Sequence, residues 1–329
     1  MNRAHFIRMS RVLGVIVSSL ALFFIWTSIS FAQFSLGNDE LRITSSPLFP
    51  EPNQMVRLSI DTFAVDVVGA DIYWYVDGVL QEQLQNSLEV EITAEGLGSQ
   101  TPVEVRVVKN GITTQIINHT IQPIEIDIIV EADTYIPQLY KGRALAGSES
   151  NIRLIAFVHT GSGINASELS YRWSIDRGVL FGGALKGRNV VETTMPIFEG
   201  SYVMVEVTDR NGNLIGQKTV PLTRHQPELY FYEYSPLRGL AQKAIDEDLI
   251  VISDPTTIYA EPYFMNMKNN AIDAIFEWEV GNEKIETPQI PNVISVRDPG
   301  DKDFAKLSAS VRSGLAQYLK ESIMLRFNQ

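Results

Sequence analysis

The sequence predicts an all-β chain of three tandem β-sandwich domains behind an N-terminal signal peptide. Three observations predict it: a basic and then apolar leader, one strand pattern that occurs three times at nearly constant spacing, and no ten-residue amphipathic run typical of a helix. With 329 residues, 45% hydrophobic and 20% charged, the chain has enough apolar material to form cores and is not disordered. Its length corresponds to two or three domains of ordinary size.

The composition excludes several classes of protein. The chain has no cysteine, so it holds no disulfide, no cysteine-ligated metal and no thiol nucleophile. Its net charge of −12 argues against nucleic acid as a partner, because phosphate binding needs a basic face.

The first thirty-two residues have the three regions of a secretory signal peptide. Arg3, Arg8 and Arg11 are followed by the apolar run 12–29, and small residues precede a cleavage point after Ala32. The alternative is a retained anchor, because about 18 apolar residues are the minimum that spans a bilayer. No second run of spanning length follows, so we expect a mature chain without a membrane span. It would be exported to the periplasm, the cell surface or the medium.

Three tryptophans mark an internal repeat. Trp74, Trp173 and Trp278 are separated by 99 and 105 residues, and each is the middle of three alternate large apolar residues. This alternation predicts a strand with one face in a core. The three strands are Ile72–Val76, Tyr171–Ile175 and Phe276–Val280.

A second alternating strand follows each tryptophan strand. Its first core residue lies 29, 30 and 29 residues after the tryptophan, and its middle residues are Val105, Val205 and Ala309. We expect these residues to pack in the three cores with the tryptophans. An Asn-Gly or Ser-Gly turn comes next, because tight hairpins need a positive φ. The strands that close the repeats are Ile112–Ile121, Leu214–Leu222 and Ala316–Phe327.

Two further strands complete each repeat. The strands before the tryptophans are Met55–Thr62, Asn151–Thr160 and Thr256–Phe264. The strands between the tryptophan and valine strands are Ser87–Thr93, Asn189–Thr194 and Asn292–Arg297. We place the domains at 33–123, 124–223 and 224–329. Because no Gly/Ser linker joins them, a semi-rigid monomeric rod is expected.

The pattern resembles the immunoglobulin-like fold, in which a core tryptophan packs over a later alternating strand. The usual disulfide is absent here. The segments 74–78 and 173–178 are similar to the strand and Asp/Gly turn of bacterial PKD-like surface repeats, whereas 278–282 lacks the aspartate. The resemblance implies three extracellular, non-catalytic modules.

The sequence contains no recognisable catalytic constellation. His119, His159 and His225 are far apart, and no hydrolase, P-loop or metalloprotease motif is present. We therefore predict that the protein is not an enzyme and uses no cofactor. Calcium is an alternative at 209–213, where we favour a hairpin turn, and at the acidic residues Glu125, Asp127, Glu131, Asp133, Asp246, Glu247 and Asp248.

Aromatic and basic residues form one candidate interaction surface. A Tyr-X-Pro motif begins at both Tyr135 and Tyr234, 99 residues apart. The segments around them are expected either to cap a strand edge or to contact a neighbouring domain or partner. The residues of this surface are Tyr135, Tyr140, Lys141, Arg143, Tyr230, Tyr232 and Tyr234.

Two functions follow from these features. The first is a non-catalytic exported protein of the bacterial envelope or surface, with a structural, adhesive or assembly role and a protein partner. The second is a carbohydrate-binding module that stacks sugars on exposed tyrosines, including Tyr73 and Tyr75.

Overall fold

A computed structural model gives the arrangement of most of the chain after the leader. It describes residues 41–61, 67–161, 163–252, 255–267, 274–281, 283–286, 288–313 and 317–327. The predicted signal peptide and its cleavage point after Ala32 lie outside these residues. Within them, no helix is long and apolar enough to cross a membrane.

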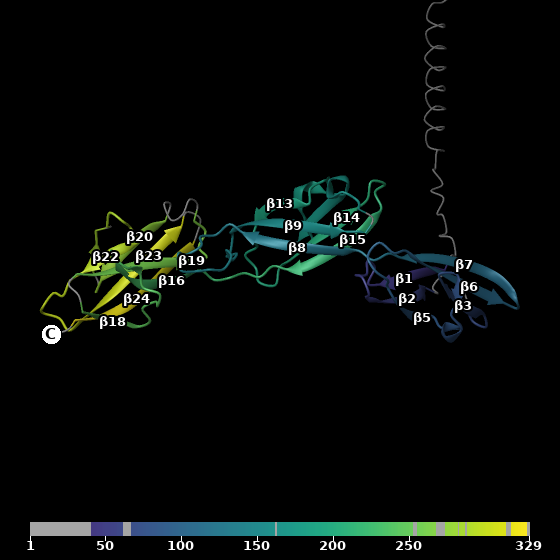
Figure 1. The fold of residues 1–329 in the computed structure, drawn as a ribbon, viewed down its shortest axis with the longest axis horizontal. Helices are drawn as coiled ribbons and strands as arrows, with labels where there is room; N and C mark the ends of the chain where they lie inside the picture. Colours follow the sequence, from purple (N-terminus) through teal and green to yellow (C-terminus); the bar gives the residue numbers. More distant parts are fainter. Residues whose placement is uncertain are drawn as a thin grey trace, which may run out of the picture. The chain divides into compact units, whose positions relative to one another are not determined.

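The described chain is all-β, as predicted. It forms strands β1 to β24 in six sheets, with three short 3₁₀ turns as its helical elements (Figure 1). The sheets occur in pairs along the sequence, and each pair belongs to one of the three predicted repeats. Contacts divide the described residues into two compact units, one within 41–45, 57–91 and 102–120, and the other within 46–56, 92–101 and 121–327.

The first repeat has a three-stranded and a four-stranded sheet. The first sheet has the order β1 (Arg42–Ser46), β2 (Met55–Asp61), β5 (Glu89–Thr93). The second has the order β4 (Val79–Leu80), β3 (Asp71–Val76), β6 (Thr101–Lys109), β7 (Ile112–Ile121). Strands β3 and β4 are joined by Asp77 and Gly78, both at positive φ, which is the backbone a two-residue hairpin needs.

The second repeat follows the same plan. Its first sheet has the order β13 (Val190–Thr194), β9 (Asn151–His159), β8 (Glu125–Ala132). Its second has the order β11 (Gly178–Val179), β10 (Ser170–Ile175), β14 (Tyr202–Thr208), β15 (Leu214–Pro221), with β12 (Leu185–Lys186) also paired to β10.

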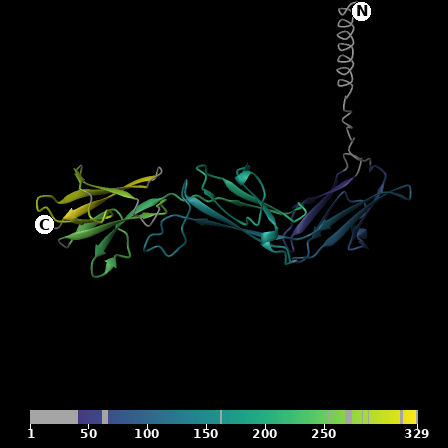
Figure 2. The same cartoon turned by 90° about the horizontal axis from the view of Figure 1, so that it is seen from above.

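The third repeat is the most elaborate, and Figure 2 shows its two sheets as separate layers. One sheet has the order β17 (Gly239–Leu240), β16 (Glu228–Ser235), β19 (Thr256–Tyr263), β22 (Val293–Val296). The other has the order β18 (Asp248–Val251), β24 (Gln317–Phe327), β23 (Phe304–Ser313), β20 (Ile275–Val280), β21 (Glu283–Ile285).

The tryptophans occupy the same place in all three cores. Each is at most 1% exposed. Across the antiparallel ladder Trp74 lies opposite Val105, Trp173 opposite Val205 and Trp278 opposite Ala309. These partners are fully buried as well. Each pair is 31 or 32 residues apart in the sequence, so the three repeats share one register.

The indole N–H groups follow the same rule. Trp74 Nε1 donates to the carbonyl of Ser87 at 2.9 Å, Trp173 to that of Arg188 at 3.0 Å, and Trp278 to that of Pro291 at 2.8 Å. Each acceptor lies two residues before the start of a strand of the facing sheet, which is β5, β13 or β22. The hydrogen bond satisfies a buried donor and ties the two sheets together.

Several strands were not predicted, and β18 is the one that changes an earlier assignment. Asp248 was assigned to an acidic junction, but it begins β18, which pairs in parallel with β24 and places Asp248 beside Arg326 in an ion pair. Asp248 is exposed at the edge of the sheet, where its carboxylate stays in water. The acidic residues at 246–248 were therefore compatible with a strand.

Candidate functional site

The main polar and aromatic cluster lies on the outer face of the sheet that contains β16 and β19. Alternate residues of these strands, such as Phe231 and Ala260, face the core, so their neighbours face outward. The connection between β8 and β9 packs on this outer face. We call the cluster the aromatic joint; its members are Tyr135, Tyr140, Tyr230, Tyr232, Tyr259, Glu261, Tyr263 and Phe264.

Glu261 is the buried centre of the aromatic joint. It is 1% exposed although it lies on the outward side of β19. The Tyr135 hydroxyl donates to its Oε1 at 2.7 Å, and the Tyr135 backbone N–H donates to the carbonyl of Met265 at 3.0 Å. One residue from the β8–β9 connection is thus held to the third repeat at two points.

Burial controls the ionisation of this group. It raises the pKa of Glu261, while hydrogen bonds from Tyr135, Tyr259 and the backbone of Gln138 oppose that shift. Burial and the nearby carboxylate raise the pKa of Tyr259 to about 12 and also raise the pKa of Tyr135. Both tyrosines therefore stay protonated as hydrogen-bond donors at neutral pH.

Ring contacts surround the carboxylate. Tyr140 meets Phe264 edge to face at 5.0 Å between centroids and Tyr263 at 6.4 Å, and Tyr230 meets Tyr263 at 5.2 Å. Such pairs contribute about 0.5–1.5 kcal/mol each beyond the area that they bury. The arrangement is a packed protein contact and not an open binding cleft.

The predicted surface residues separate into two groups. Tyr232, one of the candidate interaction residues, is buried: it is 6% exposed, and its hydroxyl pairs with that of Tyr263 at 2.7 Å. Tyr230 and Tyr234 do reach solvent, with 39% and 37% of their surface exposed. Lys141 and Arg143 are exposed as well. The alternation along β16 showed which side chains point outward. It did not show that the β8–β9 connection covers part of this outer face.

The two Tyr-X-Pro motifs do not occupy equivalent positions. Tyr135 lies beyond the end of β8, whereas Tyr234 is within β16, opposite Thr257. Ala156 and Ala260 are equivalent, since their N–H groups donate to the carbonyls of Asn189 and Asn292 at 2.8 Å in both repeats. Counted from these alanines, Tyr234 corresponds to Glu131.

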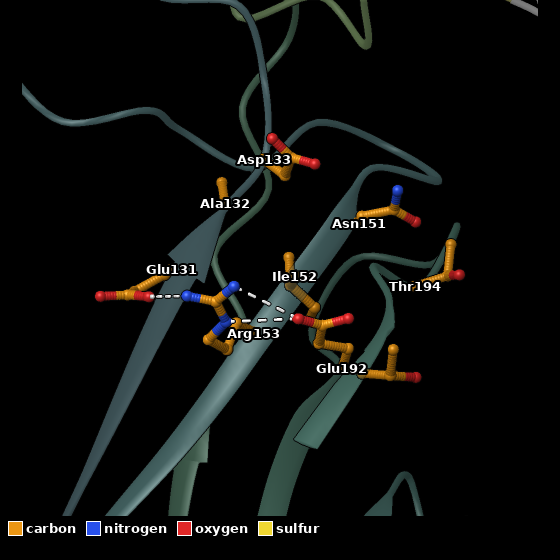
Figure 3. Close-up of a pocket in the computed structure, with 9 residues that line it drawn as sticks. Glu131, Ala132, Asp133, Asn151, Ile152, Arg153, Glu192 and Thr194 are labelled. Carbon is orange, nitrogen blue, oxygen red and sulfur yellow. Dashed lines mark hydrogen bonds and ion pairs between the residues drawn. The ribbon is translucent and has the colours of Figure 1, made fainter. Parts of the chain in front are cut away.

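A second feature is an open hollow of about 530 Å³ at the ends of β8, β9 and β13 (Figure 3). Arg153 points between two carboxylates there, 3.5 Å from Glu131 and 3.3 Å from Glu192. Figure 3 shows Asp133 and Asn151 beyond this bridge. The guanidinium already pairs with the two acids, and no group of three His, Asp or Glu residues in the described chain is arranged to hold a metal. Calcium stays an untested prediction.

Asp209 has the role of a turn residue. Its Oδ1 accepts the N–H groups of Asn211 and Asn213 at 2.8 Å each, and the Asn213 side chain donates to Oδ2 at 3.0 Å. These bonds, that from the Asn213 backbone first, lower the pKa of Asp209. The carboxylate therefore shapes the β14–β15 hairpin, the alternative that we favoured over a calcium loop.

The histidines are separated in the structure as in the sequence. His119 lies on β7, where burial lowers its pKa, His159 ends β9, and the ring of His225 lies 6.5 Å from that of Phe264. Within the described residues, none of the three belongs to a group of His, Asp or Glu side chains that could hold a metal ion.

Known proteins share only a distant likeness with the chain. No protein-family model matches it, and no curated protein matches it. Among solved structures, three domains of the bacteriophage RB49 outer capsid protein Hoc align over 88% of this chain and 98% of their own, at 10% identity and a TM-score of 0.24. Immunoglobulin domains 1–4 of Sidekick-1 align over 88% and 75%, at 10% identity and a TM-score of 0.22.

An array of fibronectin-III domains is similar to this chain at about the same low level of identity and TM-score. The central array of RIM-binding protein covers 86% of this chain and 95% of its own, with 13% identity and a TM-score of 0.27. TM-scores this low say nothing about the ligand, partner or activity of this chain.

Proposed function

We propose that this chain is an exported, non-catalytic array of three immunoglobulin-like sandwiches that binds a protein partner at a bacterial envelope. The leader and the PKD-like resemblance support export and location. The domain limits 33–123, 124–223 and 224–329 belong to the same proposal.

The aromatic joint is the observation that carries the proposal. It shows how this chain uses an outward sheet face: a loop with tyrosines covers Glu261 in a dry, hydrogen-bonded contact between protein segments. The hollows lined by Arg153 and by Tyr230 are open to solvent, with volumes of about 530 and 600 Å³. Protein contact is therefore the chemistry that the described surface supports best.

The test is binding of the mature chain to bacterial envelope fractions. The chain is first expressed with its own leader, and the exported product is weighed by mass spectrometry, with Gln33 expected as the N-terminus. Binding is then measured to untreated, protease-treated and periodate-treated fractions. We expect that protease abolishes binding and that periodate does not. Binding that resists protease and is lost with periodate would contradict a protein partner.

Carbohydrate binding is the second candidate, favoured by the exposure of Tyr230 and Tyr234 on one outward strand face. Sugars stack on such rings. A glycan array with the mature chain tests it, and Tyr230→Ala with Tyr234→Ala should abolish any saturable signal. The matched control is Tyr232→Phe, because that ring is buried.

A further inference from the structure

The outer face of the β13–β9–β8 sheet in the second repeat carries an apolar strip. Val190, Ile155 and Ile129 lie directly opposite one another on the three strands, and Phe157 is next outward on β9. Val190 is 39% exposed, Ile129 40% and Phe157 44%. We call these four residues the Ile155 face. Contiguous apolar side chains on a sheet surface mark a contact site more often than single ones do.

Acidic residues border the Ile155 face on both sides. Arg153 pairs with Glu131 and Glu192 at one end, whereas Glu125 and Asp127 lie at the other end of the strands. An occupant should therefore be apolar at its centre and positively charged at its margins.

The same face is already occupied in the third repeat. Because Ala156 and Ala260 are equivalent, Ile129, Ile155 and Phe157 correspond to Tyr232, Tyr259 and Glu261. Those three residues belong to the aromatic joint and are covered, Glu261 to 1% exposure. The equivalent sheet face is therefore covered in the third repeat and exposed in the second.

The β8–β9 connection, which covers this face in the third repeat, indicates what kind of segment binds such a face. It is an irregular stretch after β8 that brings Tyr135 and Tyr140 onto the sheet and carries Lys141 and Arg143 directly after them. In the third repeat the tyrosines of this segment cover Glu261 and Tyr263, and Lys141 and Arg143, which follow them in the sequence, are exposed. This combination is the one that the charge of the Ile155 face requires.

We propose that the Ile155 face binds an aromatic and basic loop of a separate partner protein, in the way that the β8–β9 connection covers the third repeat. This inference rests on the proposed function, since it names the surface and the partner chemistry of a protein-binding array. The partner supplies tyrosine or phenylalanine for the strip and lysine or arginine for the acidic border.

The test uses a fluorescent peptide with the sequence of residues 134–145 as a mimic of the partner loop, titrated with the mature chain. We expect saturable binding that weakens with added salt, because the border is charged. Phe157→Asp should weaken it by about tenfold or more, the effect of losing a central apolar contact. A peptide with Lys141→Glu and Arg143→Glu should not bind.

Two controls separate this result from misfolding and from non-specific adhesion. Ile112→Asp changes a side chain that is 69% exposed on β7 and should leave peptide binding unchanged. Asp127→Asn with Glu125→Gln keeps the strip and should weaken binding at low salt and reduce its salt dependence. Each variant is first shown to unfold at the wild-type temperature. A second substitution, Phe157→Ser, replaces Phe157→Asp if the aspartate variant is unstable.

Three results would overturn the proposal. They are no saturable peptide binding, binding that Phe157→Asp leaves intact, and self-association of the mature chain that Phe157→Asp abolishes in sedimentation, which would make a second copy the occupant. Envelope binding that is sensitive to protease but indifferent to Phe157→Asp would overturn this inference alone and leave the proposed function standing.

Discussion

The Tyr135 hydroxyl donates a hydrogen bond to Glu261 across 126 residues of sequence, and Glu261 is almost completely withdrawn from water. A buried carboxylate is costly unless its lone pairs are satisfied. The donor comes from the β8–β9 connection, so the second repeat supplies what the third repeat needs. The contact is therefore specific, because it requires a hydrogen-bond donor at the position of Tyr135.

Removing the donor should therefore destabilise the joint. We expect Tyr135→Phe to lower the free energy of unfolding by about 1–3 kcal/mol, because it removes a hydrogen bond to a buried carboxylate. Chemical unfolding followed by near-ultraviolet circular dichroism measures it. The matched control is Tyr140→Phe, which keeps the ring contacts to Tyr263 and Phe264. Equal losses in both variants would show that the Tyr135 hydroxyl has no special role.

Replacing Glu261 with glutamine should change how stability depends on pH. The pKa of Glu261 is raised by burial, so its stabilising contribution is full below its ordinary value of 4.5 and is lost as pH rises through the raised value. Glutamine accepts the same hydrogen bond without a charge. We expect Glu261→Gln to be more stable than wild type at pH 7, by about 1 kcal/mol, and nearly equal to it near pH 4. Parallel pH curves for the two proteins would contradict this.

Gly216 has no room for a side chain at the seam between β15 and β8. A Cβ there would lie 2.7 Å from Ile126 Cδ1 and 2.9 Å from Ile124 Cδ1. Gly216→Ala should cost about 1–3 kcal/mol through overpacking. Adding Ile126→Val removes the nearer methyl, so the double variant should lose less than the sum of the single losses, measured as a double-mutant cycle. Additive losses would mean that the methyl does not obstruct the site.

Local alternation was enough to predict the main strands of each repeat, but not short ones such as β4, β11 and β17. The strand before Trp173 was expected at 151–160 and is Asn151–His159, and the closing strand expected at 112–121 is Ile112–Ile121. The burial of Trp74 and Val105 in one core was predicted from the alternation, whereas their pairing across the ladder is seen only in the structure. The predicted features depend on neighbours in sequence and on one apolar face.

The aromatic joint could be predicted only in part. Tyr135 and Tyr140 were selected for their chemistry, but Glu261 was not, since a carboxylate at an outward strand position normally faces water. Its burial depends on a connection more than a hundred residues earlier in the chain. The one local signal was its place between Tyr259 and Tyr263 on the same strand face. The burial of Tyr232 was not predicted for the same reason: alternation shows which way a side chain points, not what covers it.

Asp209 offers a test of the turn assignment. Hydrogen bonds from Asn213 and Asn211 lower its pKa, so its contribution to stability is present at neutral pH and is lost as pH falls through the depressed value. Nuclear magnetic resonance titration should give Asp209 a pKa below that of ordinary aspartates. Asp209→Ala should raise amide exchange at the tip of the β14–β15 hairpin. A calcium-dependent shift of the Asp209 resonance would instead support the calcium alternative.

Each core tryptophan should stabilise mainly its own repeat. Trp74, Trp173 and Trp278 each lie in a separate sandwich and donate to a carbonyl of the facing sheet. Substitution by alanine should cost about 3–5 kcal/mol, the usual loss for a fully buried large aromatic. Hydrogen exchange resolved by peptide should show lost protection in the altered repeat first. Because Trp278 lies far from the first repeat in sequence and packs in its own core, Trp278→Ala should leave exchange around Trp74 unchanged. If all three repeats lost protection together after one substitution, they would form a single cooperative unit and not three cores.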